Sequence, residues 1–206
     1  MRTPEGRTAG GRAGRPPATD HDAIALVAFE LFRERGYDDV TMEEIAAAVG
    51  IGRTTLWRYF PTKHSLLWVH QDVYAREYQE ALAARPPDED LAIGAFRAYR
   101  TLGKLHPEWG ESARQMIRAA EATPSTSTGK WDEFSEWGEF TAVFVASRRG
   151  GSPADAGNKA LGFAIWSAIW AAGVVWALSD DVDETSAMDE ALRAIVPDAP
   201  SLRTWD

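Results

Sequence analysis

The chain has no cysteine among its 206 residues. This absence excludes a catalytic thiol, a cysteine-ligated zinc or iron–sulfur centre and a structural disulfide. A cysteine-free chain suits a reducing compartment, and the first residues contain no apolar run of the signal-peptide type. We therefore expect a cytoplasmic protein.

Catalytic and metal-binding motifs are also missing. The sequence has no P-loop, no Gly-x-Ser-x-Gly and no His-Glu-x-x-His. Gly50-Ile51-Gly52 begins like a dinucleotide-binding fingerprint, but no predicted strand precedes it and Thr55 stands where a third glycine is needed. The four histidines, which are His21, His64, His70 and His106, show no i, i+4 pairing of the kind that holds a metal on a helix. We expect no catalysis, no metal site and no cofactor.

No segment alternates polar and apolar residues convincingly with the period of a β-strand. Apolar residues recur at helical spacing instead, and 45% of the residues are hydrophobic, which is typical of a folded chain. The sequence therefore predicts an all-α fold of about nine helices without an internal repeat. The expected helices cover residues 20–36, 41–50, 52–59, 63–85, 88–105, 108–121, 129–148, 153–179 and 184–196.

Charge is distributed unevenly along the chain. The formal net charge is −9, yet residues 1–63 carry nine basic and nine acidic residues, whereas residues 64–206 carry thirteen and twenty-two. Residues 50–63 contain three basic residues and no acidic one, and residues 1–19 hold four arginines against Glu5 alone. Because docking depends on the local field, this acidity does not exclude a nucleic-acid partner. Residues 1–19 have almost no large apolar side chain, so we expect a disordered basic arm there.

A helix-turn-helix is outlined between residues 41 and 60. Thr41 and Glu44 match a capping box, Gly50-Ile51-Gly52 forms a tight turn, and a second short helix follows. Its spacing places Leu56 and Phe60 toward the core. The outward residues can donate to phosphates and base edges, and they are Arg53, Thr54, Thr55, Trp57, Arg58 and Tyr59.

The sequence resembles the TetR family of bacterial transcriptional regulators over about residues 20–67. The resemblance rests on Ala28-Phe29-Glu30-Leu31-Phe32, Gly36-Tyr37, Thr41-Met42-Glu43-Glu44-Ile45-Ala46, Val49-Gly50-Ile51 and Thr55-Leu56-Trp57-Arg58-Tyr59-Phe60-Pro61-Thr62-Lys63. It implies a DNA-binding domain over residues 20–66 and a ligand-binding and dimerisation domain over residues 67–206. It further implies a homodimer whose third helices enter successive major grooves of a pseudo-palindromic operator until a small inducer binds.

The resemblance also implies roles for individual residues. It assigns phosphate contacts to Thr41, Thr54, Trp57, Tyr59 and Lys63, and base reading to Arg53, Thr55 and Arg58, with the turn residue Gly52 beside them. The family usually has tyrosine at the position of Trp57, whose indole can donate to a phosphate but lacks the hydroxyl's acceptor capacity. The alternative is that Trp57 packs between helices. The arginines of the arm either follow the minor groove or belong to a plain disordered end.

Residues 160–179 contain no charged residue, which meets the length rule for a membrane span. Six alanines dilute this segment, and Trp166 and Trp170 fall in its middle rather than at an interface. A helix that packs against its own domain on one face and against a second subunit on the other is also apolar on all its faces, as a membrane span is. We therefore expect no membrane span. The resemblance places the dimer interface on helices 153–179 and 184–196, and Gly162, Ala168, Ala172 and Gly173 are small enough for close helix approach.

Aromatic residues gather in the second half of the chain, where they either fill a core or line a cavity. Together with the implied architecture they predict a pocket for a bulky apolar or aromatic inducer. The expected ligand-binding residues are Phe96, Tyr99, Trp109, Met116, Phe134, Trp137, Phe163, Trp166 and Trp170.

Two groups of basic residues leave an alternative open. Some family members respond to acyl-CoA thioesters, whose phosphates could be held by Arg97, Arg100 and Lys104 on one helix or by Arg114 and Arg118 on the next. Solvated helix faces explain both groups as well. The sequence predicts a ligand-responsive repressor. The alternative is a helical small-molecule or acyl-CoA binding protein, or an enzyme, whose DNA-binding motif is not its main role.

Overall fold

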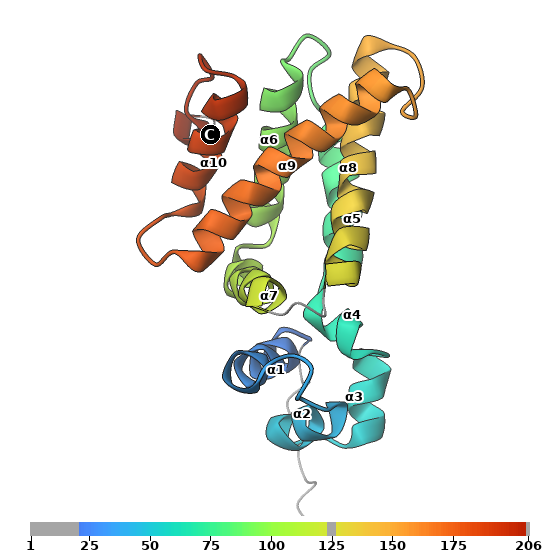
Figure 1. Cartoon of the computed structure of the whole chain (residues 1–206), viewed down its shortest axis with the longest axis vertical. Coiled ribbons are helices and arrows are strands. Elements are labelled where there is room, and N and C mark those ends of the chain that lie inside the picture. The colour runs from blue at the N-terminus through green and yellow to red at the C-terminus, as the bar shows by residue number, and fades with distance from the viewer. Residues whose placement is uncertain (1–20, 123–126, 205–206) are drawn as a thin grey trace, which may run out of the picture.

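The computed structural model describes residues 21–122 and 127–204, and within these ranges it contains helices and no strand (Figure 1). The all-α prediction is thus confirmed, while the expected arm at residues 1–19 lies outside the described ranges. The first four helices are α1 (His21–Arg35), α2 (Met42–Val49), α3 (Arg53–Tyr59) and α4 (Lys63–Leu67). They are followed by α5 (Gln71–Ala83), α6 (Leu91–Leu105), the 3₁₀ helix η1 (Pro107–Trp109), α7 (Gly110–Ala122), α8 (Ser127–Arg149), α9 (Ala156–Leu178), α10 (Glu184–Ile195) and the 3₁₀ helix η3 (Leu202–Thr204).

The helix expected over residues 63–85 is wrong, because the chain breaks between α4 and α5. His70 has a left-handed backbone with φ of 65°, which no continuous helix tolerates. Its ring is held on both sides, since Nε2 lies 3.0 Å from Oδ1 of Asp22 and the ring stacks on Trp109 with a centroid distance of 3.9 Å. The break also turns Trp68 and Val69 into the interior. Apolar spacing continues through the break, so periodicity could not reveal it.

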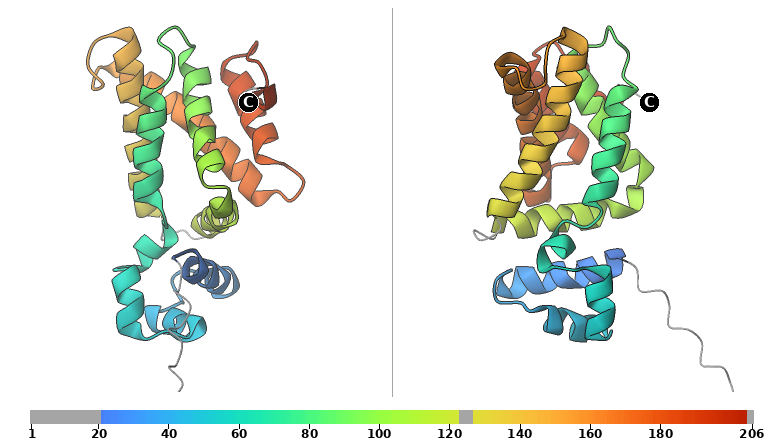
Figure 2. Two further views of the ribbon diagram at one scale, coloured as in Figure 1. Left: turned by 180° about the vertical axis from the view of Figure 1, so that it is seen from behind. Right: turned by 90° about the vertical axis from the view of Figure 1, so that its right-hand side faces the viewer.

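Helices α1 to α4 enclose one hydrophobic core at the lower end of the molecule (Figures 1 and 2). Its fully buried side chains include Ile24, Phe29, Ile45, Leu56 and Leu66. Trp68 and Val69 belong to the same core, as do Ala119 and Ala120 of α7. The boundary expected at residue 66 therefore falls inside a core that extends to α7.

A second core lies among α5, α6, α8, α9 and α10. Helices α8 and α9 cross closely at Gly162, where a side-chain Cβ would lie 2.5 Å from the backbone of Ala142. The rings of Tyr78, Trp137 and Trp166 stack in sequence near this crossing, at centroid distances of 5.1 and 4.8 Å. Gly162 thus serves packing within the chain, whereas the sequence predicted a role at the subunit interface.

Among the described helices, α9 is long and apolar enough to cross a membrane by length and composition, with a mean hydropathy of 1.8 over its most apolar window. In the structure it packs between α8 and α10 and crosses the C-terminal body diagonally (Figure 1). Ile165, Trp166 and Ile169 on its inner face are buried. Its length and apolar character are therefore explained by packing in a helical body.

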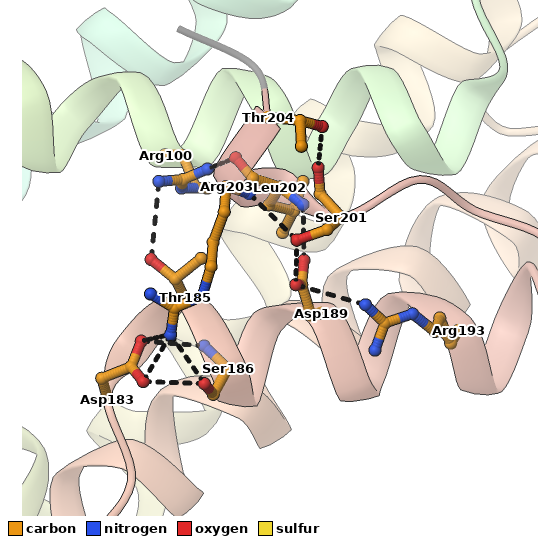
Figure 3. Close-up of polar contacts among 10 residues, drawn as sticks. All are labelled: Arg100, Asp183, Thr185, Ser186, Asp189, Arg193, Ser201, Leu202, Arg203 and Thr204. Carbon is orange, nitrogen blue, oxygen red and sulfur yellow. Dashed lines mark hydrogen bonds and ion pairs between the residues drawn. The ribbon is translucent and has the colours of Figure 1, made fainter.

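The C-terminal segment is fixed to α10 and α6 by polar contacts (Figure 3). The buried carboxylate of Asp189 accepts hydrogen bonds from the backbone N–H of Leu202 at 2.6 Å and from the hydroxyl of Ser201. Arg100 on α6 donates to the carbonyl of Leu202, and Arg203 pairs with Asp183 at 2.6 Å before the first turn of α10. These contacts hold the start of α10 beside α6.

The α8–α9 crossing generates a stability prediction. Gly162→Ala forces a methyl group into the backbone of α8 and should lower the free energy of unfolding by about 1–3 kcal/mol. Gly157→Ala on the same helix is the control, because its Cβ meets only the end of the Arg149 side chain at 4.0 Å. That change should alter stability by no more than about 1 kcal/mol. Chemical denaturation measures both, and equal stability of the two variants would contradict this packing.

Candidate DNA-binding face and ligand cavity

The turn between α2 and α3 has the geometry that a helix-turn-helix needs. Gly50 ends α2 in the left-handed conformation with φ of 77°, and the N–H of Ile51 returns to the carbonyl of Ala46 at 3.0 Å. The carbonyl of Gly52 then accepts from the backbone of Thr55 at 2.9 Å and so begins α3. The capping box of Thr41 fixes the other end of α2.

The residues of α3 divide into two faces as the spacing predicted. Leu56 and, directly after the helix, Phe60 are buried in the N-terminal core. Arg53, Thr54, Trp57 and Arg58 are exposed, while Thr55 and Tyr59 are half-buried. Trp57 keeps 42% of its surface exposed, so it does not pack between helices. The outward face therefore exposes donor groups of Arg53, Thr54, Trp57 and Arg58.

Arg53 is held on this face by a surface ion pair. Its guanidinium lies 2.8 Å from a carboxylate oxygen of Glu43 on α2, and 70% of its side chain is exposed. Exposed pairs of this kind contribute only about 0–1 kcal/mol, so the guanidinium can exchange this partner for another anion at small cost.

Thr41 and Lys63, two residues with implied phosphate contacts, serve the fold in this structure. The Thr41 hydroxyl accepts from the backbone N–H of Glu44 and donates to its carboxylate. The Lys63 ammonium donates to the carbonyls of Tyr37 at 2.6 Å and Val40 at 3.0 Å, and it lies 4.3 Å from the centroid of the Tyr37 ring. Burial lowers the pKa of Lys63 from its usual value. This lysine therefore fixes the loop between α1 and α2, which no local sequence pattern reveals.

A cavity of about 300 Å³ lies between α7 and the helices of the C-terminal body. Aromatic side chains dominate its wall: Trp68, Tyr74, Tyr99, Phe134, Trp137, Trp166, Trp170 and Trp176. The other lining residues are Gln71, Leu102, Gly103, His106, Pro107, Gly110, Ala113, Met116, Ile117, Glu133 and Glu184. Six of the nine residues expected at the pocket line this cavity, namely Tyr99, Met116, Phe134, Trp137, Trp166 and Trp170.

The other three expected residues lie outside the cavity. Phe96 is fully buried in the C-terminal core. Phe163 packs against Gly138. A Cβ added at Gly138 would lie 2.9 Å from the Phe163 ring. Trp109 stacks between the rings of His70 and His106, at centroid distances of 3.9 and 3.7 Å. All three were named for ring size, which does not distinguish a core from a cavity wall.

The stack around Trp109 joins the N-terminal helices to the cavity. His70 contacts Asp22 of α1, and His106, which lines the cavity, lies 2.8 Å from the carboxylate of Glu77 on α5. A row of side chains thus runs from α1 through Trp109 to the cavity wall. The three rings lie within 5° of parallel to their neighbours in the stack.

Two of the residues that line the cavity are acidic, Glu133 and Glu184. Burial raises the pKa of Glu133 to about 7, helped by the nearby carboxylate of Glu136 and opposed by a hydrogen bond from Gln71. Burial also raises the pKa of Glu184, while the charge of Arg100 lowers it. No lysine or arginine occurs among the lining residues in the described part of the chain. Sequence reasoning missed both glutamates because neither belongs to a motif.

The four arginines considered as ligands of acyl-CoA phosphates have partners within the chain. Arg97 pairs with Glu89, and Arg100 donates to the carbonyl of Leu202. On α7, Arg114 donates to the carbonyl of Ser179, and Arg118 pairs with Asp180 at 2.8 Å. These four arginines tie helices and loops together, so they do not form a prepared phosphate site.

Comparison with known proteins agrees with this geometry. The family model described as bacterial regulatory proteins of the tetR family matches residues 24–67, and the model of the MftR C-terminal domain matches residues 91–200. A Mycobacterium tuberculosis protein named as a mycofactocin biosynthesis transcriptional regulator, MftR, is 27% identical over 187 residues, 89% of this chain and 93% of the relative. The regulator EthR of the same species is 29% identical over 148 residues, 68% of this chain and 67% of the relative.

Two solved structures share the fold. The Thermus thermophilus repressor FadR, described in complex with lauroyl-CoA, is 22% identical, with a TM-score of 0.52 over 86% of this chain and 93% of that chain. A Pectobacterium atrosepticum regulator is 22% identical, with a TM-score of 0.50 over 86% of this chain and 90% of that chain. The match of the C-terminal domain extends the relationship well beyond the helix-turn-helix. The chain belongs to the TetR family of bacterial regulatory proteins and is a DNA-binding transcriptional regulator.

Proposed function

We propose that this regulator is a repressor that leaves a pseudo-palindromic operator when a bulky aromatic or apolar molecule occupies the cavity. The observation that supports this proposal is the shared position of α7. Met116 and Ile117 of this helix line the cavity, whereas Ala119 and Ala120, less than one turn further on, are buried in the N-terminal core. A ligand that displaces α7 must therefore move the helices that carry the DNA-binding face.

Two further contacts support this coupling. Trp68, between α4 and α5, lines the cavity and also belongs to the N-terminal core. The stack of His70, Trp109 and His106 connects α1 to the cavity along a second route. Packed side chains transmit displacement because interiors have little free volume. Occupancy of the cavity and the orientation of α1 to α3 are thus coupled in this proposal.

For the DNA complex, we place α3 in the major groove. Arg53, Thr55 and Arg58 read base edges, and Thr54, Trp57 and Tyr59 donate to phosphates. Gly52 lets the backbone approach the duplex closely, since it carries no side chain. We assign Lys63 and Thr41 primarily to holding the α1–α2 loop and the start of α2, because their polar atoms are already engaged there. The acidic C-terminal body repels DNA, so that DNA approaches the protein at the DNA-binding helices α1 to α3.

A dimer is required for a pseudo-palindrome, and α9 presents a surface suited to it. An exposed stripe of small and apolar residues runs along this helix, formed by Ala160, Ala164, Ser167, Ala171, Val175 and Leu178. Exposed Val143 of α8 and Ile195 of α10 add further apolar surface on its two neighbours. We propose that the interface is centred on this stripe, with α10 at its margin as the resemblance implied.

The alternative reading, a binding protein or enzyme that only borrows the DNA-binding motif, predicts no operator. Selection of duplexes from a random pool by the purified protein separates the two. The regulator should enrich an inverted repeat and bind it with strong salt dependence. For a natural operator, the likeness to MftR makes regions upstream of mycofactocin biosynthesis genes the first to test. Failure to enrich any sequence would contradict the proposed function.

The DNA-binding face yields a pair of opposite predictions. Arg53→Ala should weaken binding to the selected duplex by about 1–3 kcal/mol and relax specificity at one position of each half-site, because a base contact is lost. Glu43→Gln should tighten binding, because it frees Arg53 and removes a negative charge beside the duplex. Gel-shift titration measures both changes. Changes of the same sign would show that Arg53 does not face the DNA.

Lys63 should behave differently from Arg53. Lys63→Met keeps the aliphatic stem but removes the donors to Tyr37 and Val40, so it should lower the free energy of unfolding by about 1–3 kcal/mol. Lys159→Met is the control, since Lys159 forms an exposed pair with Glu139 that contributes little. Thermal denaturation compares the two variants. If both are as stable as the native chain, the loop-fixing role of Lys63 is refuted.

The proposed interface predicts the effect of a charge at its centre. Ala171→Arg should give a monomer in light scattering at micromolar concentration, because the guanidinium would be buried without a partner. The control is Ala83→Arg, which places the same side chain at an exposed alanine of α5 and should leave a dimer. A monomeric native protein, or a dimeric Ala171→Arg variant, would remove α9 from the interface.

A further inference from the structure

The cavity combines aromatic walls with buried carboxylates. Glu133 reaches it from α8 and Glu184 from the start of α10, and the described lining contains no lysine or arginine. Glu133 is half-buried, but its Oε2 is inaccessible to solvent and has no hydrogen-bond partner among the described residues. Within the described part of the chain, the side chain that hydrogen-bonds this carboxylate is the neutral Gln71. Glu133 is therefore an acid with one fully buried oxygen and with no cationic partner among the described residues.

A buried, unpaired carboxylate is energetically unfavourable, and a cation beside it removes most of that cost. The aromatic walls act in the same direction, because the faces of indole and phenol rings carry partial negative charge. Seven such rings line the cavity, five from tryptophans and two from tyrosines, together with the phenyl ring of Phe134. Rings and carboxylates together give the cavity a negative potential with no positive side chain on its wall in the described part of the chain.

We propose that the effector of this regulator is an aromatic cation, with a flat ring system held between the tryptophans and an ammonium group placed beside Glu133 and Glu184. This inference rests on the proposed function, which supplies the effector, and it adds the sign of the effector's charge. A cavity of about 300 Å³ fits a molecule of two or three fused rings. An anionic ligand would instead meet two carboxylates on a described wall that contains no lysine or arginine.

The surroundings of Glu133 give this proposal a pH dependence. Glu136, Asp132 and Asp72 raise its pKa through their charges, and Gln71 lowers it through a hydrogen bond. On the facing elements, Glu184 of α10 and His106 at the end of α6 also line the cavity. Since the pKa of Glu133 is about 7, its carboxylate gains charge between pH 6 and pH 8. A ligand with a permanent positive charge should therefore bind more tightly as the pH rises through 7.

Three ligands with one ring system test the sign of the charge. The cation is (naphthalen-2-ylmethyl)trimethylammonium, the neutral counterpart is 2-neopentylnaphthalene, and the anion is 2-naphthylacetate. In calorimetric titration at pH 8 the cation should bind about tenfold more tightly than the neutral compound, and the anion should bind most weakly. Equal affinities, or tighter binding of the anion or of lauroyl-CoA, would overturn the proposal.

A matched pair of variants tests the assigned residue. Glu133→Gln should weaken binding of the cation about tenfold, leave the neutral compound unaffected and abolish the rise in affinity between pH 6 and pH 8. Glu136→Gln, at an exposed position one turn away, should keep tight binding and the pH dependence. Unchanged binding by the Glu133→Gln variant would overturn the assignment. The comparison of ligands and of pH in the native protein needs no variant and remains decisive if one fails to fold.

The same compounds separate this inference from the proposed function. If the cation binds through Glu133 but leaves the operator complex intact in a gel shift, the ligand class stands and the repressor mechanism fails. If the neutral or anionic compound releases the operator and the cation does not, the mechanism stands and the ligand class fails. Release by the cation alone supports both.

Discussion

The rest of this structure depends on helix α7, one part of which lines the cavity while another part is buried in the N-terminal core. Met116 and Ile117 of this helix line the aromatic cavity, and Ala119 and Ala120, less than one turn further on, are buried in the N-terminal core. Small alanines allow α7 to lie close against α1, so a shift of this helix cannot be absorbed by loose packing. The DNA-binding helices and the cavity are therefore connected by a tightly packed helix, α7, rather than by a flexible linker.

Charge also differs between the N-terminal DNA-binding helices and the C-terminal body that holds the cavity. Residues 1–63 carry equal numbers of basic and acidic residues, with Arg53 and Arg58 on α3, and residues 64–206 carry the whole of the net −9. Part of that negative charge is structural, because acids of the body hold arginines that tie α6, α7 and the C-terminal segment together. Another part lies inside the cavity, at Glu133 and Glu184. We propose that the acidic C-terminal body restricts DNA to the N-terminal helices and that the cavity favours cations.

The sequence predicted the elements whose signals are local. Capping residues, turn glycines and apolar spacing located α1 to α3 and the inward side of Leu56 and Phe60. Features that depend on distant contacts were missed. The break at His70 is stabilised by Asp22 and Trp109, and Lys63 binds carbonyls more than twenty residues away. Side-chain size located six of the nine expected cavity residues, five aromatic residues and Met116. It failed for the other three, because only tertiary packing decides whether a large side chain fills a core or borders a cavity.

The coupling through α7 is tested most directly by the distance between the DNA-binding domains of the two subunits. Because the chain has no cysteine, Ala47→Cys on the exposed side of α2 provides one labelling site for each subunit. Pulsed electron paramagnetic resonance then measures the distance between spin labels without ligand and with saturating (naphthalen-2-ylmethyl)trimethylammonium. Coupling through α7 predicts a displaced distance distribution in the saturated protein. An unchanged distribution, with calorimetry showing the cavity to be occupied, would contradict it.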